Sequence, residues 1–169
     1  MEKDRQALNY TFFLLKYRDY TEKELTAKLK QKKYNSDIID KILKKLKEFG
    51  LVNDKKFTLN WISKRLASGR GLHLIKRELY EKGVKEETIQ ECVEEMKQNP
   101  EDEMLSARKI FDKKIERVKG EFKGKRLPLD KIYRSVGGYL ARRGYPVSTI
   151  NKIFKEWNSG YSSLIDSDF

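Results

Sequence analysis

The sequence predicts an all-α protein built from three tandem three-helix repeats. Seven apolar positions of the first repeat recur in two later copies, as in stacked helical arrays that bury apolar faces and leave long surfaces for a partner. No segment alternates apolar and polar residues at period two, so no strand is expected. The positions are Leu25, Leu29, Tyr34, Ile39, Ile42, Leu43 and Leu46, then Ile75, Leu79, Val84, Ile89, Cys92, Val93 and Met96, then Val136, Leu140, Tyr145, Ile150, Ile153, Phe154 and Trp157.

The first repeat is predicted over residues 1–50. Its first helix should run from about Asp4 to Tyr17. The second should begin at Thr21-Glu22-Lys23-Glu24, a capping box in which the threonine hydroxyl and the glutamate carboxylate bind each other's backbone amides. The third should run from about Ser36 to Phe49 and end at Gly50, because glycine adopts the left-handed conformation of a helix end without strain.

The second repeat is predicted over residues 51–99 and the third over 100–158. The third should contain the longest helix, a flexible basic loop from Gly120 to Pro128, and a helix from about Leu129 to Arg143. A loose tail is expected over residues 159–169, because that segment has no apolar period.

Glycines mark the expected turns and close contacts. Gly83 and Gly144 fit left-handed positions after helices, and the first repeat has Lys33 there, at an expected cost of about 1 kcal/mol. Gly137-Gly138 lies inside a predicted helix, where close approach of another helix is the expected compensation for a cost of roughly 1 kcal/mol each. The Gly69-Arg70-Gly71 corner either allows a sharp turn between packed helices or presents Arg70 to a partner.

The net charge of +12 and the pI near 9.6 indicate an acidic partner, although a lysine-rich proteome would also give a basic chain. Residues 105–158 hold fifteen Lys/Arg and five Asp/Glu, so the charge is concentrated in the third repeat. Cations beside glycines suit phosphate binding, because the backbone at glycine can approach the phosphate closely while the cations neutralise its charge. The candidate DNA- or filament-binding residues are Arg65, Arg70, Lys113, Lys114, Arg117, Lys119, Lys123, Lys125, Arg126, Arg142 and Arg143.

No set of catalytic residues can be assembled from the sequence. His73 is the only histidine, so the common zinc patterns lack a second ligand. It is expected at the surface or at a helix end. No phosphate-binding GxxxxGK[ST] motif occurs, and Cys92 is expected to be a small buried hydrophobe. No cofactor, metal or enzymatic activity is expected. The start MEKDRQ does not resemble a signal peptide and no apolar run is long enough to span a membrane, so a cytoplasmic location is expected.

The chain resembles the RecX family, bacterial regulators of the RecA recombinase, over about residues 5–157. The first repeat matches at Tyr20-Thr21, Glu24-Leu25 and Lys28-Leu29, and Lys33 replaces the family's usual glycine. The middle section carries the most specific match: Gly50-Leu51-Val52-Asn53-Asp54, Phe57, Trp61-Ile62, Arg65, Gly69, Gly71, Ile75, Glu78-Leu79 and Lys82-Gly83-Val84. The last repeat matches at Tyr139-Leu140, Arg142-Arg143-Gly144-Tyr145 and Ile150.

The resemblance implies an elongated, curved molecule that binds along a RecA filament on DNA and inhibits its ATPase, its growth and strand exchange. It also implies weak, nonspecific binding to single- and double-stranded DNA. We expect a monomer. The alternatives are a standalone, sequence-nonspecific DNA-binding protein and an interaction scaffold for another acidic protein.

Overall fold

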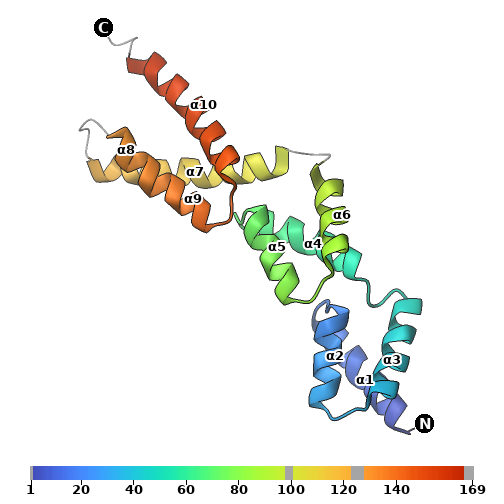
Figure 1. Cartoon of the computed structure of the whole chain (residues 1–169). Coiled ribbons are helices and arrows are strands. Elements are labelled where there is room, and N and C mark those ends of the chain that lie inside the picture. Colours follow the sequence, from blue (N-terminus) through green and yellow to red (C-terminus); the bar gives the residue numbers. More distant parts are fainter. Residues whose placement is uncertain (1, 98–100, 123–127, 166–169) are drawn as a thin grey trace. The chain divides into compact units, whose positions relative to one another are not determined.

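The computed structural model contains helices and no strand over the residues that it describes, which are 2–97, 101–122 and 128–165. The all-α prediction is therefore confirmed for this part of the chain. The helices follow in the order α1 (Glu2–Tyr17), α2 (Glu22–Gln31), α3 (Ser36–Glu48), α4 (Asp54–Ala67), α5 (Leu72–Glu81), α6 (Glu86–Lys97), α7 (Glu101–Phe122), α8 (Leu129–Ile132), α9 (Gly138–Arg142) and α10 (Val147–Ile165) (Figure 1).

The chain divides into two compact units. Unit 1 comprises Met1–Trp61 and Arg77–Met96, and unit 2 comprises Ile62–Lys76 and Lys97–Phe169. Helices α4 and α5 therefore contribute to both units. The three repeat boundaries predicted from the sequence stay predictions.

The recurring apolar positions form the interior, as predicted. None of them is exposed, and those that are only half-buried are Tyr34, Met96, Phe154 and Trp157. In unit 1 the positions of the first copy pack with Ala7 of α1 and Val52, and in unit 2 those of the third copy pack against the apolar face of α7. The repeating pattern thus predicted which side chains each helix buries.

The predicted turn chemistry is also present. The capping box at Thr21 is formed in both directions, with the Thr21 hydroxyl accepting from the Glu24 amide at 3.2 Å and the Glu24 carboxylate accepting from the Thr21 amide at 3.2 Å. Lys33 has φ 61° and is the only non-glycine residue with positive φ in the described chain, whereas Gly83 and Gly144 have φ 80° and 87°. The sequence therefore located these left-handed turns correctly.

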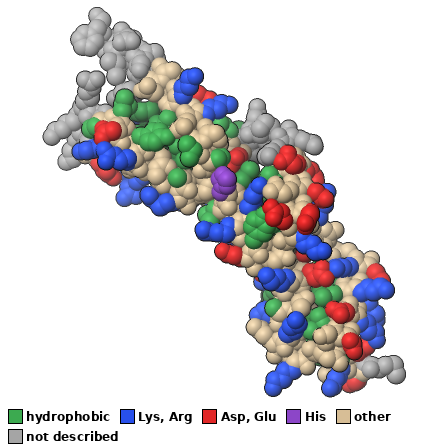
Figure 2. Space-filling view, in the orientation of Figure 1, with side chains coloured by type: hydrophobic (Ala, Val, Ile, Leu, Met, Phe, Trp, Pro, Cys, Tyr) green, Lys and Arg blue, Asp and Glu red, His purple; other side chains and the backbone are tan. Residues whose placement is uncertain are grey.

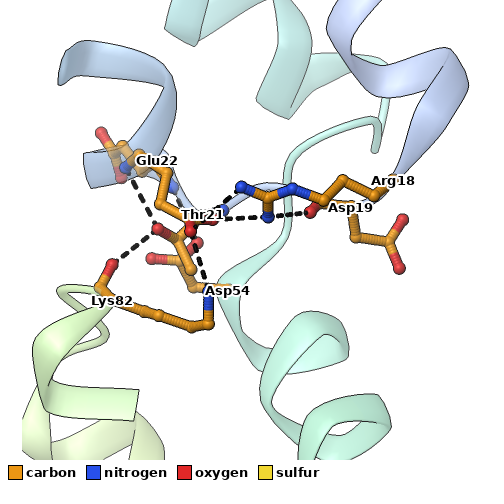
Figure 3. A network of polar contacts seen from close by, with 7 residues as sticks. Arg18, Asp19, Thr21, Glu22, Asp54 and Lys82 are labelled. Carbon is orange, nitrogen blue, oxygen red and sulfur yellow. Dashed lines mark hydrogen bonds and ion pairs between the residues drawn. The ribbon is translucent and has the colours of Figure 1, made fainter. Parts of the chain in front are cut away.

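In unit 1, the start of α2 is joined to the turn that follows α5. The Thr21 hydroxyl donates to the Lys82 carbonyl at 2.7 Å, and the Lys82 ammonium donates to the Glu24 carboxylate at 2.8 Å. Figure 3 shows these groups around the Thr21 side chain, with Asp54 accepting from the Glu22 amide at 3.0 Å. The capping box of α2 is thus also the contact between two successive three-helix segments.

Unit 2 contains a similar junction between the start of α5 and the turn that follows α9. The Gly71 amide donates to the Arg143 carbonyl at 2.8 Å, and the His73 amide donates to the Gly144 carbonyl at 3.2 Å. The start of α5 therefore meets the turn after α9, just as the start of α2 meets the turn after α5. A Cβ at Gly71 would overlap the backbone of Gly144, so glycine is required there for close packing.

Two predicted boundaries are wrong. Gly120 lies within α7, which continues to Phe122, so the predicted start of the basic loop at Gly120 is wrong, and residues 123–127 lie outside the described residues. Helix α10 continues to Ile165, although a loose tail was predicted from residue 159. Extending a formed helix needs no new nucleation, so a single glycine, Gly120 in α7 or Gly160 in α10, does not end it.

Helix packing accounts for Gly137 of the glycine pair inside the predicted Leu129–Arg143 helix, but not for Gly138, where an added Cβ would meet only Arg142 of the same helix. This helix is interrupted by a π-helical segment, Tyr133–Gly137, that separates α8 from α9. Gly137 is buried, and a Cβ there would lie 3.4 Å from the Phe154 ring and 3.6 Å from Ile150, both on α10. The expected close approach of another helix is therefore confirmed at Gly137.

Candidate nucleic-acid interface

Helix α7 buries one apolar face, and its solvent side carries cations beside the exposed carboxylates Asp112, Glu116 and Glu121. Its buried residues are spaced at helical intervals and include Phe111 and Ile115, which pack into the core of unit 2. Lys113 and Arg117 lie one turn apart and are both exposed, so their charges point to solvent. Figure 2 shows Lys and Arg side chains gathered along one edge of the region formed by α7–α9.

Tyr139 of α9 brings together two of the predicted cations. The Lys114 ammonium lies 5.5 Å from the centre of the Tyr139 ring, and the Arg143 guanidinium carbon lies 5.0 Å from it. Both distances lie within the range of cation–π attraction. The half-buried ring therefore holds a lysine of α7 beside an arginine at the end of α9.

Arg143 also has a structural role. Its Nη1 donates to the Gly69 carbonyl at 3.1 Å and to the Ser68 carbonyl at 3.4 Å. Gly69 has φ 75°, and a Cβ there would lie 2.5 Å from the Ile110 side chain. The Gly69-Arg70-Gly71 corner is therefore a sharp turn packed against α7 and held by Arg143, as the first of the two sequence interpretations proposed.

The remaining predicted residues differ in their surroundings. Arg142 is exposed, and Arg65 and Arg70 are half-buried. Lys119 pairs with Glu116 at 2.7 Å, and Arg117 pairs with Glu121 at 3.9 Å. Exposed pairs of this kind contribute little energy, so an anion can displace the carboxylates. The predicted residues Lys123, Lys125 and Arg126 lie outside the described residues.

The arrangement suits a polyanion rather than a small substrate. Lys113, Lys114, Arg117 and Arg142 are side chains of α7 and α9, and Tyr139 adds an aromatic ring beside Lys114. Lysine and arginine neutralise phosphates whatever the base sequence, and aromatic rings stack on bases of any kind. Sequence reasoning missed Tyr139, and the available signal was its spacing of one helical turn before Arg143.

The counterpart of Arg143 in unit 1 is Lys82, which serves a junction within the protein. Its ammonium lies 4.5 Å from the centre of the Trp61 ring and pairs with Glu24, which also binds Arg18 at 3.1 Å. Burial would raise the pKa of Glu24, but the hydrogen bonds from Arg18, Lys82 and the Thr21 amide outweigh it and lower that pKa. The Glu24 carboxylate is therefore held ionised between two cations.

The burial of Cys92 and the exposure of His73 agree with the sequence predictions for these two residues. Cys92 is buried, its Sγ lies 3.7 Å from the Lys55 carbonyl, and burial raises the pKa of its thiol. His73 is exposed near the start of α5. Within the described ranges, no group of three or more His, Cys, Asp or Glu side chains is placed to hold a metal ion. No described helix is both long enough and apolar enough to cross a bilayer.

Comparison with known proteins identifies the family. A family model described as the first three-helix domain of RecX matches residues 7–46, and a model of the second three-helix domain matches residues 53–93. A regulatory protein RecX from Corynebacterium efficiens is 31% identical over 156 residues, which cover 92% of this chain and 73% of that protein. Another from a Mycobacterium species is 33% identical over 148 residues, covering 86% and 78%.

Solved structures agree on the fold. The crystal structure of RecX from Lactobacillus salivarius is similar with a TM-score of 0.82 over 94% of this chain and 99% of that one, at 19% identity. A second crystal structure of a regulatory protein RecX gives a TM-score of 0.76 over 90% and 73%. At such identities these structures support the fold alone. From the sequence matches, the chain belongs to the RecX family of regulatory proteins.

Proposed function

We propose that this protein binds the RecA recombinase filament on DNA and inhibits its ATPase, its growth and strand exchange. The observation that carries the proposal is the presence of exposed cations on α7 and α9, Lys113, Arg117 and Arg142, in a chain of the RecX family. Their charge complements DNA phosphates and acidic protein surfaces alike. The protein would act in the cytoplasm as a monomer, and it would work by binding rather than by catalysis.

Inhibition would follow from unequal affinity for two states of the filament. ATP turnover requires neighbouring recombinase subunits to change their arrangement, and a bound ligand shifts such an equilibrium only by its differential affinity for the states. Exposed cations such as Lys113 and Arg117 can contact DNA or subunit surfaces in the inhibited state. If these contacts are lost when the filament changes, binding opposes the change. The elongated, curved shape that would bridge subunits stays a prediction.

The test is a recombinase ATPase assay on single-stranded DNA with increasing amounts of this protein. Inhibition well below the concentration that coats free DNA supports the regulator. Inhibition that appears only when DNA is saturated supports the standalone DNA-binding alternative. No inhibition at saturating protein contradicts both and leaves the scaffold alternative.

Charge variants locate the contact. Lys113→Gln, Lys114→Gln and Arg117→Gln together remove three positive charges from α7 and should weaken inhibition. The matched control, Lys131→Gln, Lys152→Gln and Lys155→Gln, removes three charges from other exposed positions of unit 2. Equal inhibition by the two variants would exclude the α7 face. Charge reversal of Lys119, Lys123, Lys125 and Arg126 tests the adjoining segment in the same way.

A further inference from the structure

A second cationic feature lies in unit 1, in a pocket between the start of α1 and the turn that joins α2 to α3. Three lysines line it, and none of the lining residues is acidic. All three lysines are exposed, so the pocket is open to solvent. The lining residues are Lys3, Gln6, Lys32, Lys33, Tyr34, Asn35 and Ile38.

The nearest carboxylates along the chain do not neutralise this pocket. Glu2 pairs with Arg5 at 3.5 Å, and Asp4 pairs with Lys41 at 2.5 Å. The hydrogen bond from Lys41 lowers the pKa of Asp4, which keeps that carboxylate ionised and engaged. Asp37 is exposed in the first turn of α3, outside the lining. Among the described residues, the three pocket lysines form no ion pair with a carboxylate.

The backbone conformation of Lys33 is a second indication that this pocket is a binding site. Its φ of 61° is a conformation that disfavours any residue with a Cβ, and the equivalent turns have Gly83 and Gly144. Glycine would make the turn without strain, so the turn alone does not explain a lysine here. Strained non-glycine residues occur preferentially at ligand-binding sites. Here the strained residue adds a third cation to the pocket.

The pocket walls are fixed by contacts within unit 1. The Asn35 side chain accepts from the Ile38 amide at 3.1 Å and caps α3. The Lys32 ammonium lies 5.4 Å from the centre of the Tyr10 ring on α1. Tyr34 and Ile38 are half-buried against the core of unit 1. The cations are therefore mounted on a turn with a defined shape.

We propose that this pocket binds phosphate groups of a nucleic-acid strand, giving unit 1 its own contact with DNA. The inference rests on the proposed function insofar as that function places the protein on DNA. Ammonium groups bind phosphates as point charges, and the open rim lets a continuous strand pass. The two amide side chains of the lining are engaged within unit 1, since Gln6 donates to Glu2 at 3.4 Å and Asn35 accepts from the Ile38 amide at 3.1 Å, so we expect binding to be independent of sequence.

The experiment measures binding of a labelled single-stranded oligonucleotide by fluorescence anisotropy between about 50 and 200 mM salt, without recombinase. The pocket variant combines Lys3→Gln, Lys32→Gln and Lys33→Gln. The matched control combines Lys16→Gln, Lys44→Gln and Lys85→Gln, three exposed lysines of unit 1 outside the pocket. Each lost phosphate contact lowers the slope of log affinity against log salt by about 0.7, so the pocket variant should lose about 2. Equal slopes for the two variants overturn the proposal.

Lys33→Gly separates binding from folding. Glycine relieves the left-handed strain, so the unfolding midpoint should rise while the salt slope falls by about 0.7. A higher midpoint with unchanged DNA affinity would show that Lys33 serves only the turn, and it would overturn the proposal for this residue. Because this variant gains stability, weaker binding cannot be attributed to misfolding.

A competition experiment shows whether the pocket prefers the phosphates of a nucleic-acid strand or those of a small anion. Inorganic phosphate and ATP, at the same phosphate concentration as the DNA, should leave the oligonucleotide bound. Displacement by either from wild type but not from the pocket variant indicates a small-anion site and overturns the nucleic-acid assignment. If the Lys113/Lys114/Arg117 variant lowers the salt slope and the pocket variant does not, only this inference fails and the proposed function stands.

Discussion

The Thr21 hydroxyl donates a hydrogen bond to the Lys82 carbonyl at 2.7 Å, although the two residues are far apart in the chain. The same oxygen accepts from the Glu24 amide at 3.2 Å, so one side chain caps α2 and fixes α2 to the turn after α5. In unit 2 the corresponding contact uses the backbone amide of Gly71 and the carbonyl of Arg143 at 2.8 Å. The two units thus use one type of junction with different chemical groups.

Thr21→Ala tests the junction in unit 1. The substitution removes the cap and leaves the Lys82 carbonyl without the Thr21 hydroxyl, so the free energy of unfolding should fall by about 1–3 kcal/mol. Urea unfolding followed by circular dichroism measures it. Thr26→Ala is the control, because the Thr26 hydroxyl bonds only within α2, to the Glu22 carbonyl at 2.8 Å. Equal losses for the two variants would show that the Lys82 contact adds nothing.

Gly71→Ala tests the junction in unit 2. A Cβ at this position would overlap backbone atoms of Gly144, which cannot move away as a side chain can. We expect a loss of about 2–3 kcal/mol in the free energy of unfolding, at the upper end for overpacking. Gly120→Ala is the matched control, since it lies within α7 with nothing near its added Cβ and should gain about 0.5–1 kcal/mol. A Gly71→Ala protein as stable as wild type would contradict the close packing.

The sequence predicted those features that depend on neighbouring residues. The buried positions, the capping box and the left-handed turns follow from helical periodicity and from the residue preferences of helix ends. The ends of α7 and α10 were missed, because each helix continues through a glycine that the sequence pattern suggested as a stop or a loose segment. Lys33 shows the limit of such rules, since the turn was predicted from Gly83 and Gly144 against the preference of lysine itself.

The candidate site was less predictable for a physical reason. Lys113 and Lys114 were located from charge density alone, but charge density does not tell which cation a neighbouring ring will hold. Tyr139 contacts Lys114 only because α7 and α9 pack together. The pocket containing Lys3 and Lys33 likewise joins two segments that are distant in the chain. Such sites depend on tertiary packing, which a single sequence specifies only indirectly.

The junction around Glu24 predicts a dependence of stability on pH. Burial opposes ionisation of Glu24, but hydrogen bonds from Arg18 and Lys82 prevail, so its pKa is lower in the folded state than the ordinary value of 4.5. The unfolded protein therefore binds more protons here, and stability is lost as the pH falls below about 4.5. Urea unfolding from about pH 6 to 3 measures how the free energy of unfolding falls with decreasing pH, which we call the acid limb. Glu24→Gln should make this fall less steep, that is, give a flatter acid limb.

Asp54 provides a control of opposite sign. Burial raises its pKa above the ordinary value of 3.8, despite the hydrogen bond from the Glu22 amide. The folded state therefore binds more protons at Asp54, and this residue adds stability as the pH falls. Asp54→Asn should make the acid limb steeper, whereas Glu24→Gln makes it flatter. If both substitutions change the slope of the acid limb in the same direction, the environments assigned to Glu24 and Asp54 are contradicted.

The Tyr139 ring should matter for DNA binding through the cations that it holds. Tyr139→Leu removes the ring that lies between Lys114 and Arg143. Cation–π contacts worth about 0.5–1 kcal/mol hold both cations in place before DNA binds, and without the ring binding has to order them, so affinity for single-stranded DNA should fall by roughly two- to fivefold. Fluorescence anisotropy at one fixed salt concentration measures the change.

Tyr139→Phe is the control for this last prediction, because phenylalanine keeps the ring and loses only the hydroxyl. It should bind DNA nearly as wild type does, with both cations still attracted to the ring face. Because both variants keep the charges of Lys114 and Arg143, the number of phosphates contacted should not change. The salt slope should therefore stay constant while the affinity of the leucine variant falls. If the leucine and phenylalanine variants bind equally well, the ring does not position these cations for DNA.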